Sequence, residues 1–260
     1  MNAQPAGSDF SSRARSIPDL SESIVRLLGS VDARRADSDE QREAIFRLRY
    51  DAYRREGVIS ASPSATFSDS YDQTPNAYLI GLYIEGKLAS SIRIHVASRE
   101  YPDCPTLEVF PEILQPELDA GKIIIDPTRF VADEGLSRLH LGLPYVTLRL
   151  CRLAAEYFHA DLALAAVRAE HQAFYRRAFN YQLLCEPRQY PLLAKPVSLM
   201  AIRYPTASEV VYRRLPFLRS TYAERRMLFE RNPLAGRQDE VPRQDKLVPF
   251  VEFDSKRAPG

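Results

Sequence analysis

Three arginines of this chain lie among apolar residues of predicted elements: Arg49 on the apolar face of a helix, and Arg93 and Arg129 within strands. A buried arginine needs a carboxylate partner, because an unpaired charge is costly to remove from water. Neighbouring elements offer three such partners: Asp69, Asp72 and Asp126. A buried network of these groups could organise a pocket for a charged ligand, or it could serve only to order the fold, and the residue types leave both interpretations open.

Asp69 and Asp72 form a D-x-x-D pattern in a polar loop that runs from residue 58 to residue 76. Carboxylates at this spacing could hold the arginines or an amine, or they could form an Asx-turn pair with only a local role. Asp126 and Arg129 are three residues apart, so a regular strand would place them on opposite faces unless Pro127 distorts it.

Other residue types that often carry chemistry lack the spacing it needs. The three cysteines, Cys104, Cys151 and Cys185, form no C-x-x-C motif, and we expect free thiols in a reducing compartment. The four histidines, His95, His140, His159 and His171, have no metal-ligand spacing. We expect ordinary surface or core histidines and no metal centre.

The overall charge excludes a dedicated nucleic-acid binder, because 35 Lys and Arg residues are balanced by 34 Asp and Glu residues in 260. No apolar stretch approaches the roughly 20 residues of a membrane span, and the polar N-terminus has no signal-peptide core. We therefore expect a cytoplasmic protein, with peripheral membrane contact left open. Residues 203–237 contain eight arginines and no lysine, which indicates either a docking face for an acidic partner or a solvated helix face.

The order of predicted elements indicates an α/β fold with one mixed sheet and helices on both faces. A helix begins at Ser38, with the capping-box spacing to Gln41, and stops at Gly57. Two apolar runs joined by Glu85-Gly86 predict a β-hairpin. Beyond residue 105 we expect a short helix, a strand over 122–133, a helix from 143, a strand over 161–167, a helix from 169 and a strand over 196–204. We divide the chain into an N-terminal extension (1–37), a central domain (38–205) and a C-terminal helix with a partly ordered tail (206–260).

Several segments together resemble a known family: RLRYDAYRREG (47–57), SDSYDQTPNAYLIGLYIEGKLASSIRI (68–94), PTLEVFPE (105–112) and IIIDPTRFV (123–131). The combination resembles the long-chain N-acyl amino acid synthases of the FeeM type and the related acyl-homoserine-lactone synthases, and it covers about residues 40–205. The resemblance implies a fold like that of the GCN5-related N-acetyltransferases (GNAT), with a single mixed, mostly antiparallel sheet. AFYRRAFNY (173–181) is similar to a further segment of that superfamily.

The resemblance implies an N-acyltransferase that moves a medium or long acyl chain from acyl carrier protein to the α-amine of an amino acid. Coenzyme-A-dependent relatives carry a [QR]-x-x-G-x-[GA] loop for the pyrophosphate, and the corresponding EGLSRLHLGLPYV retains only Gly142. A phosphopantetheine arm has no pyrophosphate, so the departure favours an acyl-phosphopantetheine thioester as donor substrate, with no separate cofactor. The alternatives are an acyl-homoserine-lactone-type or acyl-CoA-dependent enzyme, and a non-catalytic module that binds acyl ligands or a protein.

The residue types and the resemblance together suggest roles for eight residues. The expected catalytic residues are Asp72, Arg93, Asp126 and Tyr175. The expected substrate-binding residues are Arg49, Asp69, Glu108 and Arg129. Tyr175 would give a proton to the leaving thiolate unless it is a core aromatic residue, and Glu108 would face either the site or solvent. The arginine-rich stretch 203–237 would dock the acidic carrier protein. Candidate acyl-pocket residues, which are equally expected as plain core, are Phe110, Ile113, Leu114, Tyr145, Leu148 and the strand over 161–167.

Overall fold

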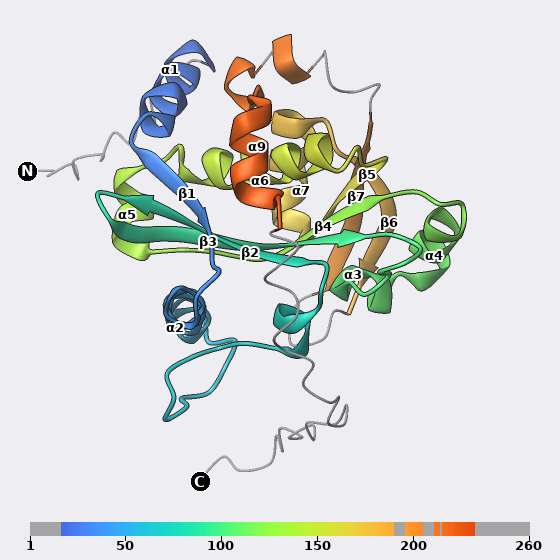
Figure 1. The fold of residues 1–260 in the computed structure, drawn as a ribbon, viewed down its shortest axis with the longest axis horizontal. Helices are drawn as coiled ribbons and strands as arrows, with labels where there is room; N and C mark the ends of the chain where they lie inside the picture. Colours follow the sequence, from blue (N-terminus) through green and yellow to red (C-terminus); the bar gives the residue numbers. More distant parts are fainter. Residues whose placement is uncertain (1–16, 190–195, 205–210, 214, 232–260) are drawn as a thin grey trace, which may run out of the picture. The chain divides into compact units, whose positions relative to one another are not determined.

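Seven strands form one sheet in the computed structural model, which describes residues 17–189, 196–204, 211–213 and 215–231 (Figure 1). The strands are β1 (Val31–Arg35), β2 (Ala77–Ile84), β3 (Lys87–Ala97), β4 (Ile124–Ala132), β5 (Leu162–Val167), β6 (Gln182–Arg188) and β7 (Val197–Arg203). Their order in the sheet is β1-β2-β3-β4-β5-β7-β6, and every neighbouring pair is antiparallel except the parallel pair β4 and β5. The prediction of a mixed, mostly antiparallel sheet is confirmed.

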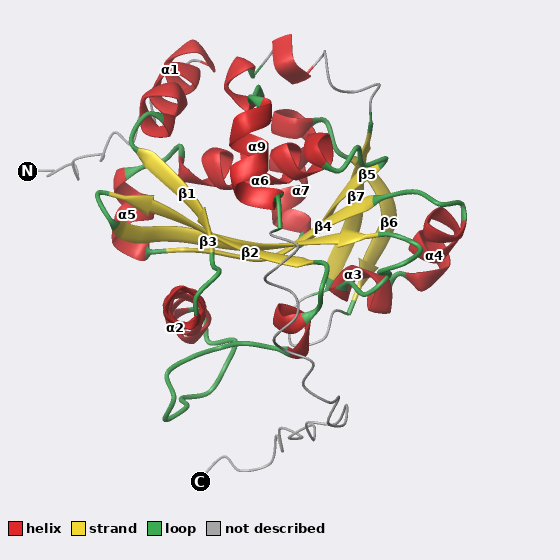
Figure 2. Ribbon diagram, viewed as in Figure 1, coloured by secondary structure: helices red, strands yellow, loops and turns green. Residues whose placement is uncertain are grey.

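Helices lie on both faces of this sheet (Figure 2). The helices on one face are α1 (Ile17–Leu28), α5 (Glu134–Leu139), α6 (Leu143–Tyr157), α7 (Ala169–Phe179) and α9 (Tyr222–Phe229), of which α5 lies at the end of the sheet. The opposite face carries α2 (Asp39–Arg55), α3 (Pro105–Val109) and α4 (Pro111–Asp119). Two 3₁₀ turns, η1 (Ser70–Gln73) and η2 (Pro216–Leu218), complete the described elements. Among these helices none is both long and apolar enough to cross a bilayer.

Local signals in the sequence explain where several elements begin and end. Ser38 and Gln41 form the expected capping box at the start of α2, and Gly57 follows its end with a φ of 69°. The turn between β2 and β3 has positive φ at both Glu85 (50°) and Gly86 (77°), the conformation of a two-residue hairpin. Pro144 lies in the first turn of α6, where its missing N–H costs nothing.

The two edge strands, β1 and β6, are absent from the sequence-based prediction. Four of the five residues of β1 belong to the charged segment DARRADSDE (32–40), whose composition does not predict a strand, and the residues of β1 alternate between exposed and half-buried. β6 contains Pro187 and is half-buried or exposed throughout. Edge strands tolerate charges and proline because the backbone along one edge of each strand forms no hydrogen bonds to another strand. Such strands therefore lack the apolar sequence pattern from which strands are predicted.

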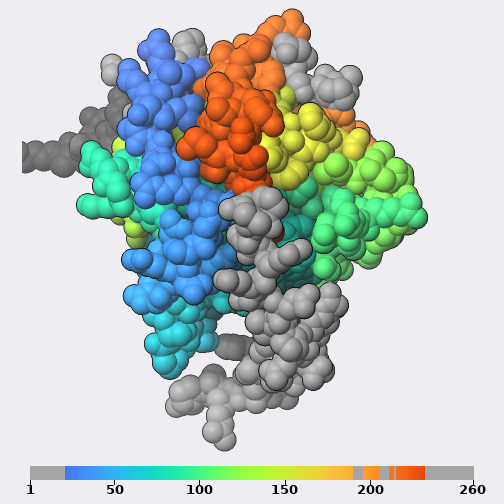
Figure 3. Space-filling model, in the orientation of Figure 1, coloured from blue at the N-terminus to red at the C-terminus, as the bar shows by residue number. Residues whose placement is uncertain are grey.

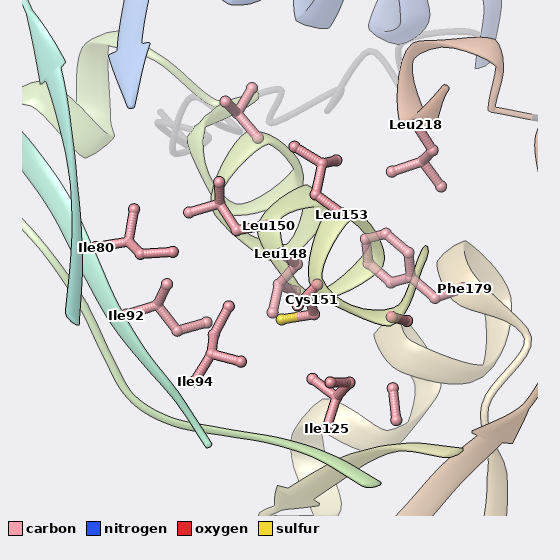
Figure 4. Packing of buried hydrophobic residues seen from close by; sticks show 14 of the residues in the cluster. Ile80, Ile92, Ile94, Ile125, Leu148, Leu150, Cys151, Leu153, Phe179 and Leu218 are labelled. Atoms are coloured by element: carbon pink, nitrogen blue, oxygen red, sulfur yellow. The ribbon is translucent and has the colours of Figure 1, made fainter. Parts of the chain in front are cut away.

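The main hydrophobic cluster joins the sheet to α6 and to segments from both ends of the described chain. Figure 4 shows Leu148 and Leu150 of α6 opposite Ile80, Ile92 and Ile94 of the sheet. Ile24 of α1 and Phe229 of α9 belong to the same cluster and are almost completely buried. In Figure 3, α9 covers the surface between α1 and α7. The elements on either side of the predicted boundaries at residues 37 and 205 therefore share one core.

Candidate active site

Asp69 and Asp72 cap the 3₁₀ turn η1 and hold each other in place. Asp69 is the N-cap residue and accepts the Tyr71 N–H at 3.0 Å, while Asp72 accepts the Asp69 N–H at 2.9 Å. The local Asx-type role and the arginine-binding role are therefore not alternatives, because the oxygens of these same carboxylates also accept from the arginines described next.

Three arginines from three different elements converge on these two carboxylates. Arg49 of α2 donates through Nη1 to both oxygens of Asp72, at 2.8 and 2.9 Å. Arg93 of β3 donates through Nη1 to Asp72 at 3.0 Å and also to Asp69. Arg129 of β4 donates to Asp69 through Nε at 3.0 Å and Nη2 at 2.6 Å. The structure thus brings together five of the eight predicted residues, and this group is called the Arg–Asp network below.

The Arg–Asp network has three positive groups and two negative ones, and it is largely inaccessible to solvent. Arg49 and Asp72 are 0% and 2% exposed in their side chains. Burial raises the pKa of the Asp69 carboxyl, but the charges and hydrogen bonds of Arg93 and Arg129 outweigh burial and lower that pKa to about 2. Both carboxylates are therefore occupied by arginine, and the three arginines exceed the two carboxylates by one positive charge.

Arg129 reaches this network because β4 is irregular at its own position. Arg93 pairs with Thr128 and Ser91 pairs with Val131, so β4 has an extra residue relative to β3. Arg129 has a φ of 55° at this bulge, a conformation that is strained for a residue other than glycine. A regular strand would turn Arg129 away from Arg93, and the distortion lies at Arg129 rather than at Pro127.

Asp126, in contrast, is not part of the Arg–Asp network. Its carboxylate accepts the Thr106 backbone N–H at 3.0 Å and the Thr106 hydroxyl at 2.6 Å. Burial raises the pKa of Asp126, although the Thr106 hydrogen bonds oppose that rise. The expectation that Asp126 pairs with an arginine is wrong for the described residues, because α3 begins beside β4 and presents Thr106 to this carboxylate first.

Several buried polar atoms around the network have no hydrogen-bond partner among the described residues. They are Nε and Nη2 of Arg49, Oγ of Ser91 and Nδ1 of His95. His95 is two residues from Arg93 on β3 and therefore lies on the same face, with its Nε2 at 3.1 Å from the Tyr71 carbonyl. Sequence reasoning placed His95 among ordinary histidines, and this alternation in the strand is the signal that could have linked it to the site.

β4 and β5 separate directly beside the network. They pair only at Ile124–Leu162 and Ile125–Ala163, and within the described chain no strand covers this edge of β4 from Asp126 onward. Pro127, at the start of the gap, lines a small cavity of about 20 Å³ on the α6 face together with Tyr175. The Arg–Asp network and Tyr175 therefore lie on opposite faces of the sheet, on either side of this gap.

Tyr175 has the protonation state that a proton donor requires. It lies on α7, with its ring against Phe174 and Tyr181. Burial, with a smaller contribution from Cys151, raises the pKa of the phenol, so it stays protonated at neutral pH. Glu108 is exposed on α3 and has no partner in the described hydrogen bonds, and the structure does not bring it to the network.

Of the acyl-pocket candidates, Leu148 lines the cavity beside Tyr175. Phe110 and Leu114 belong to a separate cluster on the opposite face, around α3 and α4. The apolar residues named from sequence are thus divided between the two faces, and the cavity that Pro127 lines at the gap is on the α6 face.

The N-terminus of α6 offers fewer free N–H groups than a usual helix start. Helix N-termini usually leave four such donors unpaired. Here Leu143 donates to the His140 carbonyl at 2.9 Å, Tyr145 and Val146 donate to the Gly142 carbonyl at 3.0 and 3.2 Å, and Pro144 has no N–H. A Cβ at Gly142 would lie 3.1 Å from a side-chain carbon of Ile24, so α1 packs closely against this position.

The arginine-rich stretch 203–237 is only partly available to a partner. Arg203 pairs with Glu117, and Arg225 pairs with Glu156. Arg214 and Arg237 lie outside the described residues. Arg176 and Arg177, on α7, are exposed and have no ion-pair partner in the described part of the chain.

Comparison with known proteins identifies the family and the fold. The sequence model of the N-acyl amino acid synthase FeeM family matches residues 44–203. The structure is similar to that of FeeM, an N-acyl amino acid synthase from uncultured soil microbes, with 18% identity, a TM-score of 0.59, and coverage of 72% of this chain and 97% of that chain. It is also similar to the CoA-dependent acyl-homoserine lactone synthase BjaI, with 15% identity, a TM-score of 0.53, and coverage of 72% and 89%. No curated protein sequence matches significantly.

Proposed function

The chain belongs to the FeeM family of N-acyl amino acid synthases, and we propose that it moves an acyl group from acyl carrier protein to the α-amine of an amino acid. The reaction is attack of a neutral amine on a thioester, with loss of a thiolate. It needs a site for the acceptor's carboxylate, a proton acceptor for the amine, and a proton donor for the thiolate. Its place would be the cytoplasm, where the carrier protein occurs.

The Arg–Asp network carries the acceptor part of this proposal. Its three arginines exceed its two carboxylates by one charge, and Nε and Nη2 of Arg49 are buried without a partner among the described residues. Leaving such donors unsatisfied costs about 1–3 kcal/mol each. An acceptor carboxylate would supply both the missing charge and the missing hydrogen-bond acceptors.

The proton transfers divide between the two faces of the sheet. An α-amino group titrates near pH 8, and Asp69, with a pKa of about 2, is too weak a base to accept its proton efficiently. The raised pKa of Asp126 makes it the better acceptor of the two, through an ordered water because Thr106 occupies the carboxylate. On the other face, the protonated phenol of Tyr175 would give a proton to the departing thiolate.

The donor part of the proposal rests on the gap and on α6. The uncovered edge of β4 offers backbone groups that can pair with the amides of a phosphopantetheine arm. In the first turn of α6 the N–H groups of Leu143 and Tyr145 are engaged and Pro144 has none. The smaller number of free donors supports the carrier-protein donor over coenzyme A with its pyrophosphate. Arg176 and Arg177, beside Tyr175, suit an acidic carrier surface better than the paired arginines of 203–237.

The test uses the purified protein with one acyl chain carried either by acyl carrier protein or by coenzyme A. The acceptor is either a mixture of amino acids or S-adenosylmethionine, and mass spectrometry identifies the products. An N-acyl amino acid formed from the carrier-protein donor supports the proposal. Product from coenzyme A alone would refute the donor assignment, and product formed only from S-adenosylmethionine would indicate a lactone synthase. Tight acyl-ligand binding without turnover would indicate a binding module.

A matched pair of variants on α2 tests the network itself. Arg49→Lys keeps the charge but loses the planar donor geometry, and we expect the KM for the amino acid to rise about tenfold or more. Arg47→Lys changes an exposed arginine two residues away, whose side chain is 63% exposed, and should leave KM unchanged. Equal effects in the two variants would remove the acceptor role of the network.

A further inference from the structure

Two cavities on the α6 face meet at a single side chain, that of Arg152. The cavity beside Tyr175 has a volume of about 20 Å³, and its lining includes Pro127, the first β4 position past Asp126 at the gap. A second, more open cavity of about 340 Å³ is lined by Glu156, Tyr212 and their neighbours. Among the described residues, Arg152 alone lines both cavities, so its side chain forms the wall between them.

This wall is held firmly in place. Arg152 donates through Nε to Glu156 at 3.0 Å and to the Tyr212 hydroxyl at 2.9 Å. Its guanidinium carbon lies 4.3 Å from the Tyr212 ring centre and 4.6 Å from that of Tyr204, within cation–π range of both rings. The side chain is 7% exposed. A guanidinium fixed by two hydrogen bonds and two rings does not move aside without losing them.

The smaller cavity is lined mainly by aliphatic and aromatic side chains, and Arg152 is the charged residue of its lining. Leu148, Phe179, Ile202 and Leu218 contribute to its lining. Nη1 of Arg152 is buried and has no partner among the described residues. At about 20 Å³ the cavity has room for roughly one water, so an alkyl chain that extends from the gap must widen it by moving the side chains of its walls. Such a chain would gain about 0.8 kcal/mol for each methylene buried there, and it would lose that gain where it meets a buried charge.

We propose that Arg152 closes the far end of the acyl-chain channel and thereby sets the longest acyl group that the enzyme accepts. The inference rests on the proposed function, because it assigns the cavity at the gap to the acyl chain of the donor. Removing the guanidinium joins the two cavities and gives a longer chain a path from Pro127 into the larger space.

The test compares the wild type with Arg152→Met over a series of saturated acyl donors lengthened two carbons at a time. We expect the chain-length limit to move to longer donors in the variant. At about fourfold for each methylene, two further carbons raise kcat/KM by up to about fifteenfold relative to the wild type. Arg152→Lys, which keeps a charge at this position, should retain the wild-type limit.

Arg149→Met is the matched control. Arg149 is also a buried arginine of α6, with a side chain that is 8% exposed and paired with Glu224, but it lines neither cavity. Its replacement should lower thermal stability without moving the chain-length limit. A shift of the limit in this variant as large as in Arg152→Met would overturn the proposal, because it would reflect general loosening of α6.

A second readout separates this proposal from the proposed function. Thermal shifts with a series of non-hydrolysable acyl-pantetheine analogues report the chain-length limit without turnover. A limit that Arg152→Met extends supports the role of Arg152 even if no donor is turned over, in which case the catalytic proposal fails alone. The same limit in wild type and Arg152→Met overturns the inference. A second result would also overturn the inference: the wild type prefers acyl chains that end in a carboxylate, and Arg152→Met loses this preference. Arg152 would then bind a terminal group rather than limit the length of the chain.

Discussion

His95 should make the protein lose stability as the pH falls from 7.5 to 4.5. Burial, reinforced by the charge of Arg93, lowers the pKa of the imidazole from 6.5 to about 3. Because the Tyr71 carbonyl can only accept, Nε2 of His95 carries the hydrogen and Nδ1 is left bare. Protonation of Nδ1 would add a second charge beside Arg93 with no acceptor for it among the described residues.

The sign and size of the effect follow from proton binding in the two states. Between pH 6.5 and pH 3 the unfolded chain binds a proton at this histidine and the folded chain does not, so lower pH favours unfolding. For folded and unfolded pKa values of about 3 and 6.5, the loss between pH 7.5 and pH 4.5 is about 2.7 kcal/mol. That is a large share of the 5–15 kcal/mol typical of whole domains.

Urea unfolding of the wild type and of His95→Gln at the two pH values measures this loss. Glutamine can still donate to the Tyr71 carbonyl but does not titrate, and the remaining groups are common to both proteins. The wild type should lose about 2.7 kcal/mol more than the variant over this range. An equal loss in both would refute the reasoning, because it would mean that folding leaves the proton affinity of His95 unchanged.

Other changes test the capping and pairing contacts, each by urea unfolding. Asp72→Asn should lower the free energy of unfolding by about 3–5 kcal/mol, because the Asp72 carboxylate is 2% exposed and pairs with two buried arginines. Asp69→Asn should lower it by less, because the Asp69 side chain is 19% exposed. A larger loss in Asp69→Asn than in Asp72→Asn would contradict the burial argument. Ser38→Ala removes the cap of α2 and should cost about 1 kcal/mol, so an unchanged stability would mean that the cap contributes nothing. Glu85→Asn should stabilise by several tenths of a kcal/mol or more, because asparagine tolerates the φ of 50° in this turn, and a loss would show that Glu85 has another role.

Elements and contacts fixed by neighbouring residues could be predicted from the sequence. The capping box at Ser38 and the turn at Glu85-Gly86 follow from patterns of two to four residues. The pairing of buried arginines with Asp69 and Asp72 also followed, because buried charges demand partners and few acids were within reach.

Contacts set by distant parts of the chain could not be predicted. Asp126 binds Thr106 because α3 begins beside β4, and nothing near Asp126 in the sequence encodes that approach. Arg129 joins the Arg–Asp network through a bulge defined by its register with β3. The packing of Ile24 against Gly142 likewise depends on α1 lying over α6.

The parting of β4 and β5 also bears on how the protein folds. The β2–β3 hairpin closes over a two-residue turn, so its strands meet early. The parallel contact of β4 with β5 comprises two residue pairs. The chain between these strands contains α5 and α6, so the contact requires a much longer loop to close. Because α6 contacts β3, β4 and β5, its docking joins the two halves of the sheet. We expect this junction to form late in folding and to be an early place for the native sheet to open, so that hydrogen exchange in β5 would report on it.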